Sequence, residues 1–319
     1  MGLKLSKRNK LYLLNLLLIV LVIACILVLR NYQNEFNLIK NVSIKYFIVL
    51  SAIALLNGIV NGLKVKYYTK IFGLNLSFKE SFGLSEITSL TNYVTPFKGG
   101  TAFRALYLKK KYNFSYEKFI VVMGAASLIA FFGYSIVGML STLYSFLAHK
   151  TVNLLILGIF ITIFTASLIA FFLPLNYMHR IKSENFIIRK LKSAIEGWYI
   201  LKNKPYNLLI ILIVELTFLF SYSLSIFYGF RAIGVNTPLV YCLIISLVSS
   251  MSVIFTITPA GLGVREAVIV WASTALEQGI IVPLNVAILI RLISMIWAIP
   301  LGLLFSYIFI KEEKKQIDV

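Results

Sequence analysis

Long apolar segments are the feature that most constrains what this chain can fold into. A membrane-spanning helix needs about 20 predominantly apolar residues, and six segments approach or exceed that length. Hydrophobic residues make up 59% of the 319 residues and charged residues only 13%, whereas soluble domains carry roughly a quarter charged residues. The sequence therefore predicts an all-α, polytopic membrane protein with one integral membrane domain over residues 1–319. The predicted spans are 11–29, 46–63, 119–147, 152–174, 207–230 and 284–308.

Two further apolar segments, 77–94 and 238–256, are ambiguous. Each leads into a Thr-Pro element with glycines, TPFKGG and TPAGLG. Proline disrupts a helix and glycine permits a sharp reversal, so each element can form the tip of a re-entrant helical hairpin. The alternative is that both segments cross the membrane, which gives eight membrane segments in place of six spans and two hairpins. The predicted tip residues are Thr95, Pro96, Gly99, Gly100, Thr258, Pro259, Gly261 and Gly263.

The Thr-Pro elements belong to a weak internal repeat. KIFGLN is followed 161 residues later by RAIGVN, and TPFKGG is followed 163 residues later by TPAGLG. The shared order predicts two units, about 46–147 and about 207–308. Counting the spans gives these units opposite orientations, which is the inverted-topology architecture of many secondary transporters.

Basic residues orient the chain. The net charge is +19, and 24 of the 31 Lys and Arg residues fall in segments on one predicted side. The positive-inside rule makes that side cytoplasmic, so we expect both termini in the cytoplasm, a plasma-membrane location and no nucleic-acid partner. The basic linker 175–206 has apolar residues at near-helical spacing, which predicts an amphipathic helix on the inner membrane surface.

Basic residues at the two tips suit a lipid headgroup. Lys98 and Arg104 accompany the first tip, and Arg265 accompanies the second. A helix N-terminus carries partial positive charge and readily binds phosphate. We therefore expect these three residues to attract an anionic headgroup.

Ionisable residues at membrane depth usually pair or face a cavity, because an isolated charge there is costly. We expect Glu266 and Arg291 to form a gating or structural ion pair. The competing arrangement pairs Glu215 with Arg265 or Arg291. Glu86, within 77–94, belongs to the same class.

Acidic and metal-binding residues are scarce in the sequence. The one aspartate is Asp318, and His149 and His179 fall on opposite predicted faces. We find no metal-ligand cluster, P-loop or nucleophile elbow in the sequence. We therefore expect no metal, no cofactor and no enzymatic activity.

Two motifs resemble a known family. TPFKGGTAFRALYLKKK near residue 100, TPAGLGVREAVI near residue 260 and Arg291 in the last span resemble the lysylphosphatidylglycerol synthase transmembrane-region family, whose members are also called flippase-like domain proteins. In bifunctional members this membrane half moves an aminoacylated lipid between leaflets, and a separate cytosolic domain makes it. The resemblance implies a stand-alone member without the synthase domain. The chain departs from the family at Thr101, where an acidic residue usually follows the glycines, and this departure points to a different headgroup.

We therefore expect a lipid translocase for a phosphate-bearing lipid, either an aminoacylated phospholipid or a polyprenyl-linked lipid. The two tips would meet near the midplane, and the energy source would be a gradient or none. The alternative is a polyprenyl-phosphate-dependent glycosyltransferase, or an accessory protein in lipid-linked glycan or envelope synthesis. A structural or regulatory membrane protein is a third possibility. Expected partners are anionic or phosphate-bearing membrane lipids and enzymes of envelope or glycan synthesis.

Overall fold

The computed structural model describes residues 39, 41–150, 153–173, 186–255 and 258–317. Within these residues all regular structure is helical. The elements are α3 (Ile44–Ile71), α4 (Phe78–Val94), α5 (Gly99–Tyr112), α6 (Tyr116–His149), α7 (Leu154–Phe172), α9 (Phe186–Leu201), α10 (Pro205–Ala232), α11 (Leu239–Met251), the 3₁₀ turns η1 (Ser252–Phe255) and η2 (Pro259–Gly261), α12 (Val264–Thr274) and α13 (Ile281–Ile317).

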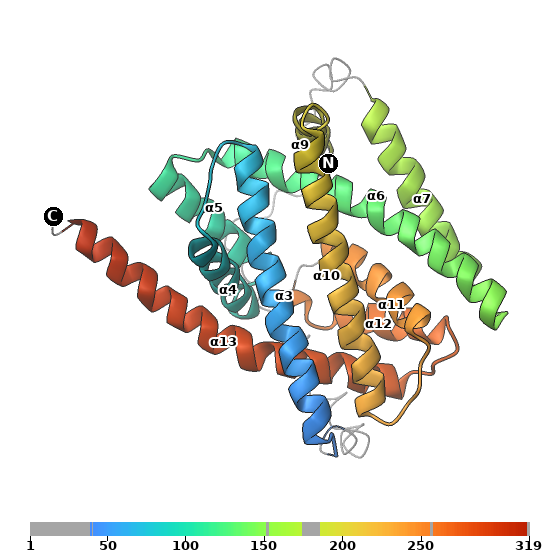
Figure 1. Cartoon of the computed structure of the whole chain (residues 1–319). Helices are drawn as coiled ribbons and strands as arrows, with labels where there is room; N and C mark the ends of the chain where they lie inside the picture. Colours follow the sequence, from blue (N-terminus) through green and yellow to red (C-terminus); the bar gives the residue numbers. More distant parts are fainter. Residues whose placement is uncertain (1–38, 40, 151–152, 174–185, 256–257, 318–319) are drawn as a thin grey trace, which may run out of the picture.

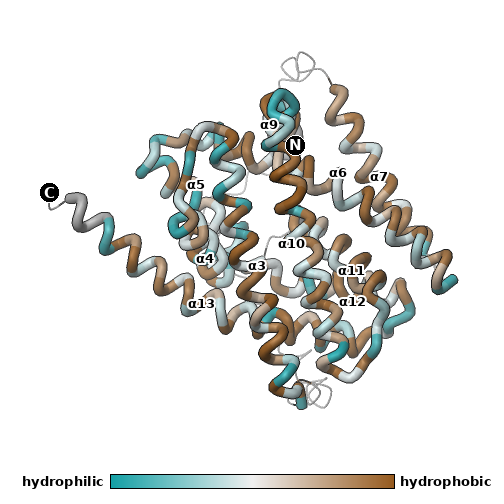
Figure 2. Tube along the Cα trace, viewed as in Figure 1, coloured by the Kyte–Doolittle hydropathy of each residue, from teal (hydrophilic) through white to brown (hydrophobic). Residues whose placement is uncertain are grey.

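Five helices of the described chain, α3, α6, α7, α10 and α13, are long and apolar enough to cross a membrane. They correspond to the predicted spans from 46–63 onward, with α7 covering 154–172 of the predicted 152–174, and span 11–29 lies outside the described residues. Their outer faces carry large exposed apolar side chains, such as Leu154 and Phe172 in α7, and Figure 2 shows α7 and much of α13 as hydrophobic. Such faces suit lipid rather than water, so the protein is a multi-pass helical membrane protein.

Four shorter helices form two pairs, α4 with α5 and α11 with α12. They contain 17, 14, 13 and 11 residues. At 1.5 Å per residue the longest reaches only about 26 Å, which is less than the roughly 30 Å of a hydrocarbon core. The segments 77–94 and 238–256 therefore give helices that are too short to cross an average bilayer.

The internal repeat is visible in the backbone. Helices α3 and α10 both have 28 residues and begin 161 residues apart, and α4 and α11 also begin 161 residues apart. Both long helices end in the same set of hydrogen bonds, in which Leu74 donates its N–H to the Thr69 carbonyl and Val235 to that of Phe230. Gly73 and Gly234 follow with the same φ of +88°, in the left-handed region that favours glycine. KIFGLN and RAIGVN are thus one turn used twice.

The two halves interlock. Helices α3 and α10 lie side by side at the centre, with α4 and α5 on one side of the pair and α11 and α12 on the other (Figure 1). Helix α4 packs against α13 of the second half, and α11 packs against α6 of the first half. The first helix of each short pair therefore contacts the last long helix of the opposite half, which places both halves around one common centre.

The predicted amphipathic helix is present as α9, within the linker 175–206. This helix packs on α6 and, at fewer points, on α7. Ile195 is fully buried, and the Trp198 ring stacks on Phe171 of α7 with ring centroids 4.1 Å apart. Gly124 of α6 and Gly197 of α9 allow the two backbones to approach closely. The helix is thus present as predicted, and its position on the inner membrane surface stays a prediction.

Candidate functional site

A polar cavity of about 190 Å³ lies between the two halves. It is lined by α3 and α4 of the first half and by α10, η2, α12 and α13 of the second half. Its charged residues are Glu86, Arg265, Glu266 and Arg291. Buried ionisable residues in a membrane protein mark functional sites by default, so this cavity is the candidate site.

The second predicted tip forms one wall of the cavity. The backbone reverses through Ala260, Gly261 and Gly263, whose φ angles are 47°, 70° and 82°. Thr258 closes the turn by donating its hydroxyl to the Leu262 carbonyl at 2.8 Å. Two of the predicted glycines thus take left-handed conformations, as expected for glycine at a reversal. The turn η2 packs against α4, so this tip contacts the first half directly.

Glu266 and Arg291 form the ion pair that the sequence favoured. The same Glu266 carboxylate accepts the backbone N–H of Gly263 at 2.8 Å and so caps α12. Arg291 also donates to the Ala260 carbonyl at 3.4 Å. The pair therefore fastens the second tip to α13, and it neutralises one of the two arginines in the cavity.

Arg265 is the other arginine of the cavity, and it has no carboxylate partner among the residues that the structure describes. Its guanidinium lies 4.4 Å from the centroid of the Tyr222 ring, and its Nε donates to the Tyr222 hydroxyl at 3.1 Å. That hydroxyl lies 3.2 Å from the Ser249 hydroxyl. A neutral phenol positions the cation but leaves its charge uncompensated, so Arg265 can take an anionic group of a ligand.

Glu86 faces the cavity from α4 and is only 4% exposed. Within the described part of the chain no group donates a hydrogen bond to its carboxylate or forms an ion pair with it. Its Oε1 lies against Gly58 of α3, where a methyl group would come within 2.7 Å. The sequence identified Glu86 only as a charge at membrane depth. Whether a donor or cation lies near its carboxylate depends on the packing of helices, which the sequence does not show.

The first predicted tip differs from the second. Its reversal is made by Phe97 and Lys98, with φ angles of 55° and 57°, and not by the predicted Gly99 and Gly100. Those glycines instead let α5 pack closely on α4, because a side chain on Gly100 would overlap the Thr88 carbonyl. The role expected of glycine at this reversal was therefore wrong.

The N-terminus of α5 lacks the carboxylate that caps α12. Thr101 and Glu266 occupy equivalent places, each two residues beyond the first residue of its helix. At α5 the N–H of Gly100 is accepted at 3.0 Å by the side-chain oxygen of Asn92 on α4. A neutral amide thus accepts a backbone N–H at the start of α5, whereas an acid accepts one at the start of α12.

Lys98 and Arg104 do not line the cavity, in contrast to Arg265. The reason is the layering of the first half, in which α4 packs against α3, α13 and η2, while α5 packs mainly against α4 and α6. Residues of α5 are therefore one helix away from the cavity. The Nε of Arg104 is buried and has no acceptor in the described structure.

Glu215 pairs with neither arginine. It forms an ion pair with Lys64 of α3 at 2.8 Å and accepts the hydroxyls of Tyr68 and, at 2.6 Å, Tyr134. The competing prediction for Glu215 was therefore wrong. Helices α3 and α10 pack against each other, and this contact brings Lys64 to Glu215. This cluster joins the two halves outside the cavity.

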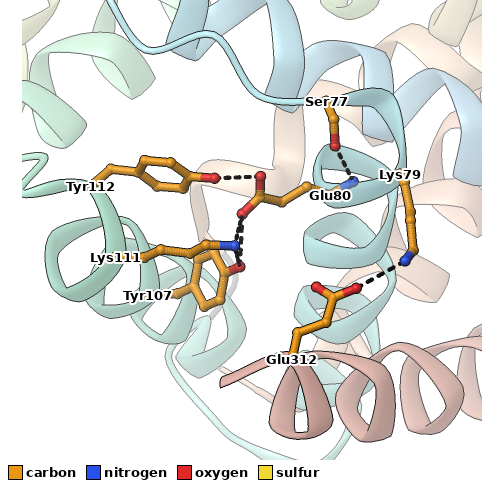
Figure 3. A network of polar contacts seen from close by, with 7 residues as sticks. All are labelled: Ser77, Lys79, Glu80, Tyr107, Lys111, Tyr112 and Glu312. Atoms are coloured by element: carbon orange, nitrogen blue, oxygen red, sulfur yellow. Dashed lines mark hydrogen bonds and ion pairs between the residues drawn. The ribbon is translucent and has the colours of Figure 1, made fainter. Parts of the chain in front are cut away.

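A further polar network surrounds Glu80 in the first turn of α4 (Figure 3). Lys111 and Tyr107 donate to one carboxylate oxygen at 2.8 and 2.7 Å, and Tyr112 donates to the other at 2.5 Å. Burial by itself raises the pKa of Glu80, but the hydrogen bonds from Lys111, Tyr112 and Tyr107 outweigh burial and hold the pKa below its ordinary value. The network fastens the open end of the α4–α5 hairpin.

Comparisons with known proteins place the chain in a family. Two UPF0104 membrane proteins of Methanocaldococcus jannaschii are similar to it. One is 23% identical over 100% of this chain and 98% of its own length, and the other is 26% identical over 70% of this chain and 98% of its own length. No solved structure was found to match the chain. Residues 12–302 match the lysylphosphatidylglycerol synthase TM region family, and the chain belongs to that family.

Proposed function

We propose that the protein is a translocase that moves a phosphate-bearing lipid between the leaflets of the plasma membrane. The observation that carries this proposal is Arg265, a cation without a carboxylate partner among the described residues, in a cavity built from both halves of the chain. The cavity offers charge for an anionic headgroup, and the lipid-facing helices around it offer a path for the apolar chains. Membership of the family supports the same function.

The size of the cavity fits a headgroup and excludes a whole lipid. Pockets for drug-sized ligands measure about 300–1,000 Å³, whereas this cavity measures about 190 Å³. A phosphate with a small polar substituent fits such a volume, and acyl or polyprenyl chains do not. The chains would therefore stay in the bilayer while the headgroup passes through the polar centre.

The short helix pairs would form two re-entrant hairpins of opposite orientation. Helix lengths support this arrangement, because none of the four short helices reaches about 30 Å. The repeated element order and the exchange of contacts between halves support an inverted repeat. Rocking of one half against the other would then expose the cavity to each leaflet in turn, with both termini in the cytoplasm.

The test is leaflet exchange in vesicles that contain the purified protein. A fluorescent phosphatidylglycerol and a fluorescent polyprenyl phosphate serve as probes, and a membrane-impermeant quencher reports the fraction in the outer leaflet. We expect accelerated exchange of at least one probe and at least a tenfold loss in Arg265→Gln, about the effect of one charge-assisted hydrogen bond. Arg231→Gln is the matched control, because Arg231 is exposed and lies outside the cavity. No acceleration of either probe by folded wild-type protein would contradict the proposal.

A further inference from the structure

The unpartnered carboxylate of Glu86 is the least expected feature of the cavity. An ionised carboxylate that is buried without a cation or donor is strongly destabilised, and such a group usually takes up a proton instead. Neither arginine of the cavity forms an ion pair with Glu86, since Arg291 is paired with Glu266 and the Arg265 guanidinium lies on Tyr222. The geometry of the cavity therefore leaves Glu86 to be neutralised by something outside the fold.

A proton fits this place better than a metal ion does. The Glu86 Oε1 lies against Gly58, and the neighbouring residue Asn57 has a buried side-chain oxygen with no donor among the described residues. A protonated carboxyl can donate to such an acceptor, whereas an ionised one cannot. A metal ion would instead share the cavity with two guanidinium groups, which repel it.

The elements that pack on α4 or line the cavity carry several charged and titratable groups. At the cavity, α12 and α13 carry the paired Glu266 and Arg291 and the Tyr222-bound Arg265, and α4 itself carries Tyr93. Helix α3 has the uncharged Asn57 and Asn61 at the cavity, and its Lys64 is bound to Glu215 outside it. Away from the cavity, Tyr107 and Lys111 of α5 bind Glu80, Glu312 of α13 binds Lys79, and Arg104 of α5 does not line the cavity. Most of the carboxylates and cations on this list hold each other or a tyrosine, whereas Glu86 holds none.

We propose that Glu86 is a proton-binding site and that its protonation couples lipid movement to a proton gradient. The carboxylate takes a proton from water on one side when the cavity opens there, and it releases that proton on the other side. Helix α4 contacts α3 of its own half and α13 and η2 of the other half, so relative motion of the halves changes the surroundings of Glu86. Coupling to lipid presupposes the translocase activity proposed above, whereas proton binding does not.

Infrared difference spectroscopy of the reconstituted protein tests proton binding without any transport assay. We expect the carbonyl stretch of a protonated carboxyl group at neutral pH, its loss in Glu86→Gln and its retention in Glu312→Gln. Glu312 is the matched control because its side chain is 49% exposed and paired with Lys79. The glutamine variant keeps the shape of the protonated acid, and size-exclusion chromatography confirms its fold. A band that persists unchanged in Glu86→Gln, or a wild-type protein without the band, overturns the site.

Leaflet exchange under an imposed pH gradient tests the coupling. In wild-type vesicles we expect the pH gradient to set the direction of net probe movement between leaflets. In vesicles with Glu86→Gln we expect probe exchange to be the same with and without the gradient. Movement that responds to a sodium gradient and not to pH overturns the coupling. If no probe moves in any vesicle, the translocase proposal fails, whereas the infrared band still decides whether Glu86 binds a proton.

Discussion

Arg291 on α13 and Glu266 on α12 form an ion pair whose carboxylate also caps the helix that follows the second tip. Their side chains are only 14% and 13% exposed. One contact thus joins a turn, a short helix and a long helix at the wall of the cavity. The arrangement makes the pair a structural support for the position of Arg265, which lies next to Glu266 in the chain.

Removing one partner of this pair is expected to destabilise the protein. Glu266→Gln or Arg291→Gln leaves a buried charge without compensation, which costs about 3–5 kcal/mol. The double variant is expected to be more stable than either single variant, because no charge is left alone. Thermal unfolding of the detergent-solubilised protein gives all three values, and equal losses in the single and double variants would contradict the interpretation.

Gly100 is expected to be required for the packing of α5 on α4. Gly100→Ala would bring a methyl group onto the Thr88 carbonyl oxygen, and overpacking of this kind costs about 1–3 kcal/mol. Gly158→Ala is the matched control, because no atom lies within 4 Å of its added methyl group. We expect the thermal midpoint to fall in Gly100→Ala and to stay at or above the wild-type value in Gly158→Ala. A similar midpoint in both variants would refute the role of Gly100.

Acid is expected to weaken the α4–α5 hairpin through Glu80. The pKa of Glu80 is lower in the folded protein than its ordinary value of 4.5. The group therefore contributes stability above about pH 4.5, and this contribution is lost as the pH falls through the folded pKa. The difference in thermal midpoint between wild type and Glu80→Gln should be present at pH 7 and should shrink below pH 4.5. A difference that is independent of pH would rule out the ionised network shown in Figure 3.

The sequence predicted the long helices well and the site only in part. Spans and the Gly73 and Gly234 turns are local features, so run length and motif are sufficient to find them. The partners Lys64 and Glu215 lie on neighbouring helices but are 151 residues apart in sequence, and no local pattern signals such a contact. The left-handed Phe97 and Lys98 were also missed, because bulky residues rarely take this conformation. Tertiary packing decides both features.

The orientation of the two tips remains the sharpest prediction about the architecture. An inverted repeat requires that the tips begin from opposite membrane faces. Phe97 and Leu262 are exposed tip residues, at 57% and 39%, so a cysteine at either position is accessible to a labelling reagent. Cys242 is fully buried, and it is replaced together with Cys25 to give a cysteine-free background.

We expect Phe97→Cys and Leu262→Cys in this background to react with a membrane-impermeant maleimide from opposite sides of sealed vesicles. The first should react from the cytoplasmic side, because its hairpin is flanked by the predicted inner basic segments, and the second from the outer side. The cysteine-free protein controls for background, and permeabilised vesicles show that both positions can react. Reaction of both cysteines from one side would mean that the halves share one orientation. In that case the contacts of α4 and α11 with the opposite half would need an origin other than an inverted repeat.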